Sequence, residues 1–356
     1  MTASALAPLV LSPKLTAAIW GGDALVRRYG KAGDAAAQLG ESWECWDRNE
    51  VTSGPDAGDT LAELRASLGR ALTGPADPAQ IFPVLTKIID ARKPLSVQVH
   101  PGDAYAQRVE HQPFGKTECW VILAAEPGAE LVLGWTRDTD RAEVERRIGD
   151  GTLGELLRRV PVAAGDAFYL PAGTVHAIGA GIQLFETQQA SDLTYRLFDW
   201  NRLGADGKPR ELHVAKSLDV LDYRATFPGA MRQLTWTEAG AERTLAIADT
   251  HFTVERVRAG AAGAEFVTDG RPVAVLATHD GATIATAGGP VALRPWETGL
   301  VPAAADVFTF AGAGEALIAR VAPDLARLRE RALANGIGAA AFDAFATQFS
   351  GVSQPA

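Results

Sequence analysis

Alternation of apolar and polar residues in KPLSVQVHP, residues 93–101, constrains this chain more than any other feature. Successive side chains of a β-strand point to opposite faces, so this run has one apolar face and one polar face. These faces comprise Leu95, Val97 and Val99 on one side and Ser96, Gln98 and His100 on the other. The apolar face belongs in the wall packing of a β-barrel. Polar groups directed into a barrel are costly without partners, and a metal ion would supply one for Gln98 and His100.

A second run, GKTECW at 115–120, brings a carboxylate into the same environment. Strand alternation puts Lys116, Glu118 and Trp120 on one face. We therefore expect Glu118 to be a third metal ligand and Lys116 to approach the same site. When each residue is considered alone, a solvated surface position is the ordinary alternative for both.

A third run, GDAFYLPAGTVHAI at 165–178, delivers a histidine at the end of a strand, after a turn shaped by glycine and proline. The complete donor set is two imidazoles, one carboxylate and one amide oxygen. Such a mixed site suits Zn²⁺, with Mn²⁺, Fe²⁺ and Co²⁺ as alternatives. The predicted ligands of a single ion are Gln98, His100, Glu118 and His176.

Short β-like runs separated by glycine and proline surround these segments. This pattern is typical of an all-β barrel with helical insertions. The runs are 83–100, 117–123, 130–135, 166–170 and 182–187. A helix is predicted over 60–72, where Thr60 and Glu63 have capping-box spacing. Thr152 and Glu155 repeat that spacing before a shorter helix. We expect residues 1–233 to form one metal-binding domain.

From about Leu234 the strand-like runs are separated by glycine-rich turns, and they are 252–257, 272–278, 289–295 and 315–321. We expect residues 234–322 to form a second, smaller barrel or sandwich without a metal site, because His251 and His279 have no other ligand types at useful spacing. Residues 323–356 are predicted to be a helical tail. Its apolar stripe, Phe342, Phe345 and Phe349, is expected to pack on the core.

Composition excludes several classes of protein. The net charge of -9 over 356 residues argues against a nucleic-acid-binding surface. Two cysteines, Cys45 and Cys119, form no disulfide framework, which suits a reducing compartment. The N-terminal segment lacks the basic start of a signal peptide, and no apolar run approaches membrane-spanning length. We expect a cytoplasmic protein, monomeric or weakly dimeric, without nucleic-acid or membrane partners.

The run from Gly165 to His176 matches the second motif of the cupin superfamily, whereas the usual His-x-His of the first motif is replaced by Gln98-x-His100 with Glu118 downstream. This combination resembles the type I mannose-6-phosphate isomerases in their shorter bacterial form. The likeness covers most of 13–220 and, more faintly, 250–320. It is carried by IWGG (19–22), GESWECWD (40–47), KPLSVQVHPGDAYA (93–106), GKTECW (115–120), YLPAGTVHAIGAG (169–181) and ETQQASDLTYRLFDWNR (186–202).

The resemblance implies a mainly β fold of two cupin-like (jelly-roll) barrels with helical insertions and a short helical tail. It also implies zinc at the four predicted ligands, Arg196 as the active-site arginine and Glu186 as the proton-transfer base. Lys93 and Lys116 match lysines that line the pocket. Arg202 matches a phosphate-binding position at which the longer members carry a different basic residue.

Several of these residues have alternatives that the sequence leaves open. Arg196 can instead form a structural ion pair with Asp192 or Asp199, and Glu186 can be an exposed strand glutamate. Lys116 can contact either a phosphate or a sugar hydroxyl. Trp20 and the run from Glu41 to Glu44 are candidates for a pocket rim that reads sugar hydroxyls, or for core aromatics and surface acids.

Isomerisation of a phosphosugar requires what this set provides. Proton transfer between C1 and C2 develops negative charge on oxygen, which a Lewis-acidic ion and a fixed cation stabilise. A base must take and return the proton. The activity that the resemblance implies is interconversion of mannose 6-phosphate and fructose 6-phosphate, and these residues would carry it through an enediolate. The alternatives are an Fe or Mn cupin oxygenase or decarboxylase, and a sugar-phosphate-binding cupin without turnover.

Overall fold

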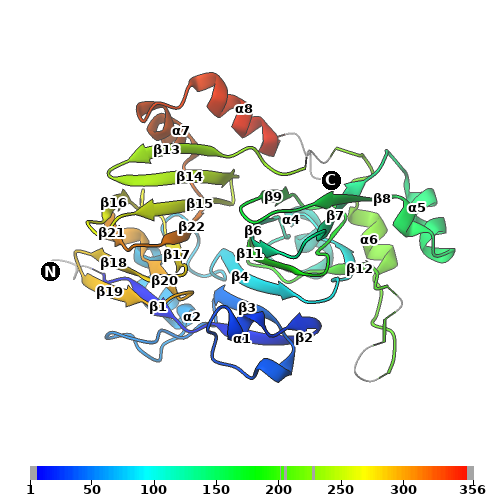
Figure 1. Cartoon of the computed structure of the whole chain (residues 1–356), viewed down its shortest axis with the longest axis horizontal. Helices are drawn as coiled ribbons and strands as arrows, with labels where there is room; N and C mark the ends of the chain where they lie inside the picture. Colours follow the sequence, from blue (N-terminus) through cyan, green and yellow to red (C-terminus); the bar gives the residue numbers. More distant parts are fainter. Residues whose placement is uncertain (1–5, 201, 204–206, 227–228, 351–356) are drawn as a thin grey trace.

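A computed structural model describes residues 6–200, 202–203, 207–226 and 229–350. Figure 1 shows two β units side by side, one formed mainly by the middle of the chain and one by the later part, with the last helices packed along the second unit. The mainly β fold class with a helical tail, predicted above, is confirmed. Among the described residues, no helix has the length and apolar content that crossing a bilayer requires.

The first unit is built from two antiparallel sheets. The six-stranded sheet has the order β2 (Lys14–Gly22), β3 (Leu39–Cys45), β4 (Val84–Ala91), β11 (Ile182–Gln189), β6 (Glu118–Ala125) and β9 (Ala167–Leu170). The five-stranded sheet has the order β12 (Tyr195–Phe198), β5 (Val97–Val99), β10 (His176–Ala177), β7 (Glu130–Trp135) and β8 (Leu157–Pro161). Apolar side chains from both sheets, including Trp120, Leu131 and Phe168, fill part of the space between them.

The strand predicted around 93–101 is shorter than expected. Val97 and Val99 pack outward against helix α6 (Val214–Val220), where they contact a cluster that includes Leu218. That part of the predicted apolar face is confirmed. Leu95 belongs instead to the interior cluster, because the strand begins only at Val97 and the alternation does not extend back past the strand start.

The second unit also has two antiparallel sheets. Its seven-stranded sheet has the order β1 (Leu9–Leu11), β20 (Thr298–Val301), β17 (Val273–Ala277), β22 (Glu315–Val321), β15 (Phe252–Ala259), β14 (Ala241–Ala248) and β13 (Leu234–Glu238). Its four-stranded sheet has the order β16 (Ala264–Val267), β21 (Val307–Ala311), β18 (Ala282–Thr286) and β19 (Gly289–Leu293). Strand β1 therefore lies beside strands nearly 300 residues later, as Leu9 pairs with Leu300. The domain limits given above remain a prediction.

One apolar core joins the two units. It contains Val121 and Phe185 from the six-stranded sheet together with Phe252 and Leu317 from the seven-stranded sheet. Cys119 is buried in the same cluster as a free thiol. Because this shared core removes a large apolar area from water, the outer face of the first unit is held directly on the second.

Helices connect and cover the sheets. Their bounds are α1 (Ala24–Arg27), α2 (Leu61–Leu68), α3 (Arg70–Thr73), α4 (Asp103–Tyr105), α5 (Arg141–Gly149), α7 (Leu325–Ala334) and α8 (Ala339–Ser350), with short turns η1 (Ala35–Ala37), η2 (Ala106–Glu110), η3 (Leu153–Glu155) and η4 (Ala303–Ala305). The capping box of Thr60 and Glu63 is formed, and Gly69, at φ 54°, divides the predicted helix into α2 and α3.

The second capping prediction is wrong. The Thr152 hydroxyl donates to Asp150 Oδ1 at 2.6 Å, and η3 is a single turn. The helix of this region is α5, which the sequence analysis missed and which Asp140 caps by accepting from the Glu143 amide at 2.8 Å. By contrast, the packing role of the tail is confirmed, because Phe342 and Phe345 are buried against Leu234 and Trp236.

A buried hydrogen-bonded group also links the two units. Tyr169 on β9 donates to Asp249 Oδ2 at 2.9 Å, and His251 Nδ1 lies 2.5 Å from Asp249 Oδ1. Burial disfavours both charged forms. The hydrogen bond and charge attraction between His251 and Asp249 outweigh the effect of burial. The pKa of His251 is therefore raised and the pKa of Asp249 is lowered. These contacts give His251 a structural role in the packing of the two units.

We expect this pair to make stability fall as the pH rises from 6 to 8. Because the folded pKa of His251 is raised above its usual 6.5, its contribution is complete below that value and is lost as the pH rises through the folded pKa. The Asp249 contribution is lost only at acid pH, as the pH falls through its lowered pKa. His251→Gln should lower Tm by about 2–4 °C at pH 6 and by less at pH 8. An equal effect at both pH values, measured by thermal unfolding, would contradict this account.

Candidate metal centre

Three strands carry the predicted ligands to one place. Gln98 on β5 lies directly opposite His176 on β10, and opposite Arg196 on β12. Residues paired directly across antiparallel strands project from the same face, so these side chains form a row on the inner face of the five-stranded sheet. His100 follows β5 by one residue, and Glu118 is the first residue of β6 in the facing sheet.

The ligand atoms converge. His100 Nε2 lies 3.4 Å from Glu118 Oε2, and His176 Nε2 lies 3.3 Å from Glu118 Oε1. The donor atoms of these three residues all lie within 4.8 Å of one another. Two ligands of a tetrahedral ion with bonds of about 2.1 Å are separated by about 3.4 Å, so the spacing fits an ion of this size.

Both histidines present the same ring nitrogen to the centre. His100 Nδ1 is 2.8 Å from the Leu193 carbonyl oxygen, and His176 Nδ1 is 2.8 Å from the Thr174 carbonyl oxygen. Because a carbonyl only accepts, each Nδ1 carries the proton and each Nε2 offers a lone pair. The Gln98 amide nitrogen is 3.2 Å from His176 Nε2, so the Gln98 side chain lies beside the centre.

The centre is buried and electrostatically prepared for a cation. Glu118 is fully buried, and the polar contacts of its carboxylate oxygens come from Lys116, His100 and His176. Burial lowers the pKa of His100 to about 4, as does the nearby Lys116 ammonium, so the ring is neutral at physiological pH. Burial opposes the charged form of Glu118, but Lys116 and His100 outweigh it and hold its pKa well below the usual range. The residues therefore fit a divalent metal ion.

Lys116 takes part in the centre directly. Its ammonium lies 2.8 Å from Glu118 Oε2 and 3.2 Å from His100 Nε2. The strand alternation that grouped Lys116 with Glu118 thus corresponds to a contact.

A cavity of about 270 Å³ opens beside this centre. Its lining includes Gln98, which contacts His176, and Lys116, which contacts Glu118, so the cavity adjoins the centre. Aromatic, acidic and basic side chains form the rest of the wall, among them Trp20, Glu41, Trp43, Lys87, Glu186, Asp192, Arg196 and Arg210. Of the predicted rim, Glu44 lies elsewhere, since it is buried in an ion pair with Lys31 at 2.6 Å.

Glu186 is an inward-facing carboxylate and not an exposed strand residue. It lies opposite Lys87 on β4 and opposite Trp120 on β6. Trp120 Nε1 donates to its Oε2 at 2.9 Å, and Lys87 Nζ lies 3.1 Å from its Oε1. These two contacts orient the carboxylate at the cavity wall, two residues along the sheet from the Glu118 ligand.

Lys87 is a site residue that the sequence analysis missed. Its ammonium lies between Glu186 and Glu41, the latter at 3.5 Å. Burial opposes its charge, but Glu41 and Glu186 outweigh that effect and raise its pKa above the usual value. In turn, Glu41 is partly buried; burial opposes its charge, but Lys87 and the Trp43 indole outweigh it and hold its pKa low. A lysine within the largely apolar strand VLTKIIDA was the available indication, because lysine is almost never fully buried unless it is paired.

Arg196 has neither of the carboxylate partners that the sequence offered. Its side chain donates to the Ser96 hydroxyl at 3.3 Å and to the Glu211 carbonyl at 2.8 Å. Burial lowers its pKa, as does the nearby Arg210. Asp199 instead pairs with Arg202 and Arg210. Arg196 is thus a partly buried cation at the cavity wall.

Two of the predicted substrate-binding residues lie outside the cavity lining. Lys93 is exposed, and Arg202 is held by Asp199 and by the carbonyl of Pro94. Arg210 lines the cavity in place of Arg202 and binds Asp199 with two hydrogen bonds of 2.6 Å. No local pattern in the sequence indicated Arg210, because its position depends on how the loop after β12 returns to the site.

A double β-barrel with a buried His–Glu–His centre and a charged cavity defines a metal-binding enzyme of the cupin type. The family described as "Phosphomannose isomerase type I, catalytic domain" matches residues 9–124. Mannose-6-phosphate isomerase from Streptococcus mutans is 38% identical over 257 residues, covering 69% of this chain and 77% of that relative. Mannose-6-phosphate isomerase ManA from Bacillus subtilis is 45% identical over 222 residues, covering 60% of this chain and 68% of that relative.

The structural comparison agrees. The crystal structure of mannose 6-phosphate isomerase from Bacillus subtilis superposes with a TM-score of 0.80 at 32% identity, covering 89% of this chain and 100% of that one. The chain belongs to the mannose-6-phosphate isomerase family. The predicted family and isomerase class are confirmed.

Proposed function

We propose that this chain interconverts mannose 6-phosphate and fructose 6-phosphate at the cavity beside the His–Glu–His centre. The observation that carries the proposal is the placement of a carboxylate, Glu186, and a cation, Arg196, in the wall of one cavity that Gln98 and Lys116, the neighbours of the His–Glu–His centre, also line. This arrangement supplies a base and a stabiliser of negative charge next to a Lewis-acid position, which aldose–ketose isomerisation requires.

We further propose one Zn²⁺ per chain, held by His100, Glu118, His176 and the oxygen of Gln98. The donor set, two imidazole nitrogens with two oxygens, suits Zn²⁺, and the spacing of the donors fits an ion of that radius. When bound, the ion polarises the substrate carbonyl and its neighbouring hydroxyl oxygen as a Lewis acid.

Proton transfer is assigned to Glu186. Its carboxylate lines the cavity from β11. In the pairing of β11 with β6, Glu186 lies opposite Trp120, two residues from the position opposite Glu118. In this role it takes the proton from C2 of the aldose and returns it to C1, while the proton of the O2 hydroxyl passes to O1. The Trp120 indole and the Lys87 ammonium keep its two oxygens oriented during both steps.

We assign the stabilisation of the negative charge on the enediolate oxygens to two cations, Lys116 and Arg196. Lys116 lies at the metal centre, which favours contact with a hydroxyl or carbonyl oxygen of the sugar over contact with the phosphate. Arg196 lies beside Gln98 in the same row, where its position is set by Ser96 and Glu211. Fixed charges of this kind act without reorganisation at the moment of reaction.

Arg210 is the cation best placed for the phosphate. Arg210 lines the cavity together with Arg196. Its two hydrogen bonds to Asp199 use two of its five N–H donors. Arginine is well suited to bidentate phosphate recognition. Binding energy from this remote end would position the reacting carbons.

We expect Arg210→Met to raise KM for mannose 6-phosphate by about 10–100-fold, because a charge-assisted contact is worth about 1.5–3 kcal/mol. The matched control is Arg202→Met. Arg202 also pairs with Asp199 but does not line the cavity, so its removal should change KM far less. Steady-state kinetics on both variants decide the point. A large rise with Arg202→Met alone would instead support the assignment implied by the family resemblance.

The function is tested by incubating the purified, metal-loaded protein with mannose 6-phosphate and measuring fructose 6-phosphate. Turnover is expected, and unphosphorylated mannose should react poorly. Binding of mannose 6-phosphate without any product would support the non-catalytic alternative. Oxygen consumption or release of CO₂ would support the oxygenase or decarboxylase alternative. The cytoplasmic location and the monomeric or weakly dimeric state remain predictions from the sequence.

A further inference from the structure

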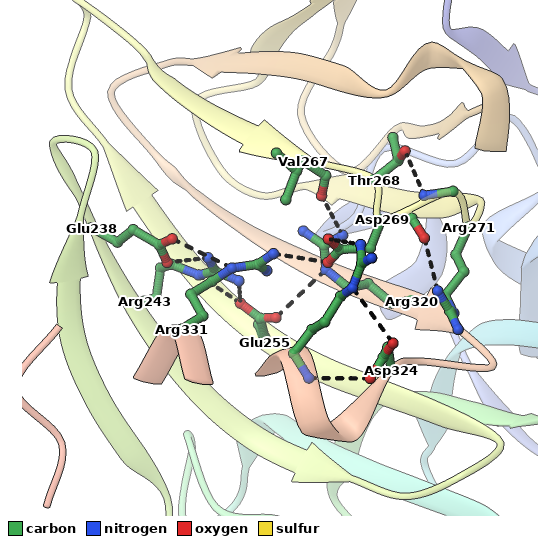
Figure 2. Close-up of polar contacts among 12 residues, drawn as sticks. Glu238, Arg243, Glu255, Val267, Thr268, Asp269, Arg271, Arg320, Asp324 and Arg331 are labelled. Carbon is green, nitrogen blue, oxygen red and sulfur yellow. Dashed lines mark hydrogen bonds and ion pairs between the residues drawn. The ribbon is translucent and has the colours of Figure 1, made fainter. Parts of the chain in front are cut away.

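Arg243 and Arg331, which lie where helix α7 covers the second barrel, are arginines held by carboxylates (Figure 2). Arg243 Nε donates to Glu255 Oε2 at 2.8 Å, and Arg331 Nη2 donates to Asp269 Oδ2 at 2.8 Å. In such a pair one contact both fixes the guanidinium and compensates its charge. An arginine held in this way serves the fold and has little charge left for a ligand.

Arg196 at the cavity wall is held differently. Its Nη1 donates to the Glu211 carbonyl oxygen at 2.8 Å and its Nε donates to the Ser96 hydroxyl at 3.3 Å. In the described part of the chain, no carboxylate forms an ion pair with it. Because both acceptors are neutral, the guanidinium keeps its charge beside the cavity. A cation that acts on developing negative charge must still be fixed in place, so the neutral contacts have to do this.

The backbone of Arg196 is fixed from the outer edge of its sheet. Strand β12 is the last strand of the described five-stranded sheet, so one of its edges faces no other strand of that sheet. At this edge the His213 amide donates to the Arg196 carbonyl oxygen at 2.8 Å, and the Arg196 amide donates to His213 Nδ1 at 3.2 Å. Arg196 therefore lies between Gln98 on β5 and His213 on the other side.

The imidazole of His213 is free for this contact because the helix that follows does not use it. His213 is the N-cap residue of α6, yet its side chain makes no capping hydrogen bond within the described chain. Its backbone, at φ -108° and ψ 48°, also lacks the extended geometry typical of a capping residue. The helix itself is anchored, because Leu218 packs in one cluster with Val97 and Val99 of β5. Since a backbone amide only donates, Nδ1 carries a lone pair and the proton of the neutral ring is on Nε2.

We propose that His213 is a positioning residue of the isomerase reaction, which fixes the Arg196 backbone and thereby the place of its guanidinium. The inference rests on the proposed function, in which Arg196 stabilises the enediolate. His213 is absent from the described residues that line the cavity, so it acts through Arg196 and not on the sugar. One short segment supplies both restraints, since the Glu211 carbonyl holds the side chain and His213 holds the main chain.

Two substitutions separate the Nδ1 contact from the bulk of the ring. His213→Leu removes the acceptor and should lower kcat for mannose 6-phosphate by about 10–100-fold, because a slightly misplaced catalytic group costs about that much. KM should change by less than about 3-fold, since Arg210 is assigned to the phosphate. His213→Asn puts an amide oxygen near the position of Nδ1, where it can accept from the same N–H, and should keep kcat within about 3-fold of the unmodified value.

Ser217→Ala is the matched control for a loosened helix. The Ser217 hydroxyl donates to the His213 carbonyl oxygen at 2.8 Å, so its removal weakens the same end of α6 and leaves Nδ1 in place. We expect normal kcat in this variant. A loss of kcat equal to that in His213→Leu would show that loosening the helix is sufficient, and it would overturn the positioning role.

Hydrogen exchange tests the contact without any need for turnover. The Arg196 amide should exchange faster in His213→Leu than in the unmodified protein, measured by mass spectrometry on peptides that cover β12, and it should stay protected in His213→Asn. Normal kcat or unchanged exchange in His213→Leu, or no recovery in His213→Asn, would contradict the proposal. Faster exchange in His213→Leu without any turnover by the unmodified protein would instead place the failure in the proposed function.

Discussion

Glu186→Gln is expected to lower kcat for mannose 6-phosphate by about 10²–10⁴-fold, because a positioned general base contributes about that much. The substitution keeps the size of the side chain and leaves an oxygen that can still accept from the Trp120 indole. Substrate binding should therefore be little changed, and KM should stay within a few-fold of the unmodified value. Steady-state kinetics separate the two effects.

Isotope exchange makes this prediction more specific. In D₂O the unmodified enzyme should incorporate deuterium at the carbon that receives the proton, and Glu186→Gln should lose that incorporation together with kcat. Glu126→Gln is the matched control, since Glu126 is an exposed strand-end glutamate paired with Arg92. If Glu186→Gln turned over at the normal rate, the base would have to be another residue, even with the isomerase function intact.

The second large effect is expected at Lys87, where Lys87→Met should destabilise the fold by about 3–5 kcal/mol. The ammonium is buried between two carboxylates, Glu41 and Glu186, and its removal leaves both without their cation. Because the unfolding entropy is about 2.1 cal/mol/K per residue, this loss should lower Tm by about 4–7 °C for a chain of 356 residues. Activity should also fall, because Glu186 loses one of the two contacts that orient it.

Lys93→Met is the control for Lys87→Met, because Lys93 is exposed and only six residues away. A surface substitution of this kind changes stability by about 0.5 kcal/mol or less. Comparable losses in the two variants, measured by chemical denaturation, would contradict the structural distinction between a buried bridge and a solvated lysine.

Strand alternation accounts for much of what the sequence could predict about the site. It grouped Gln98 with His100 and Lys116 with Glu118, and all four side chains lie at the centre or its cavity. This works because alternation is a local property of extended backbone. It failed at Leu95, where the strand had not yet begun.

The pairing of residues across strands that are distant in the sequence could not be predicted from one sequence. That Gln98 lies opposite both His176 and Arg196 depends on how three strands pair, and no local pattern encodes it. The same holds for Arg210, which reaches the cavity through a returning loop, and for β1, which pairs with β20 across most of the chain. Helix α5 was not predicted, although Asp140 supplies its cap, because Val144 is the one residue of this helix that is buried.

Metal removal and reconstitution test the central claim most directly. The protein is stripped with a chelator, its metal content is measured by mass spectrometry, and conversion of mannose 6-phosphate is followed as Zn²⁺ is added back. We predict that stripping abolishes turnover, that one Zn²⁺ per chain restores it, and that Glu118→Gln neither retains the ion nor recovers. Full turnover by the stripped protein, or normal zinc content and activity in Glu118→Gln, would contradict the account.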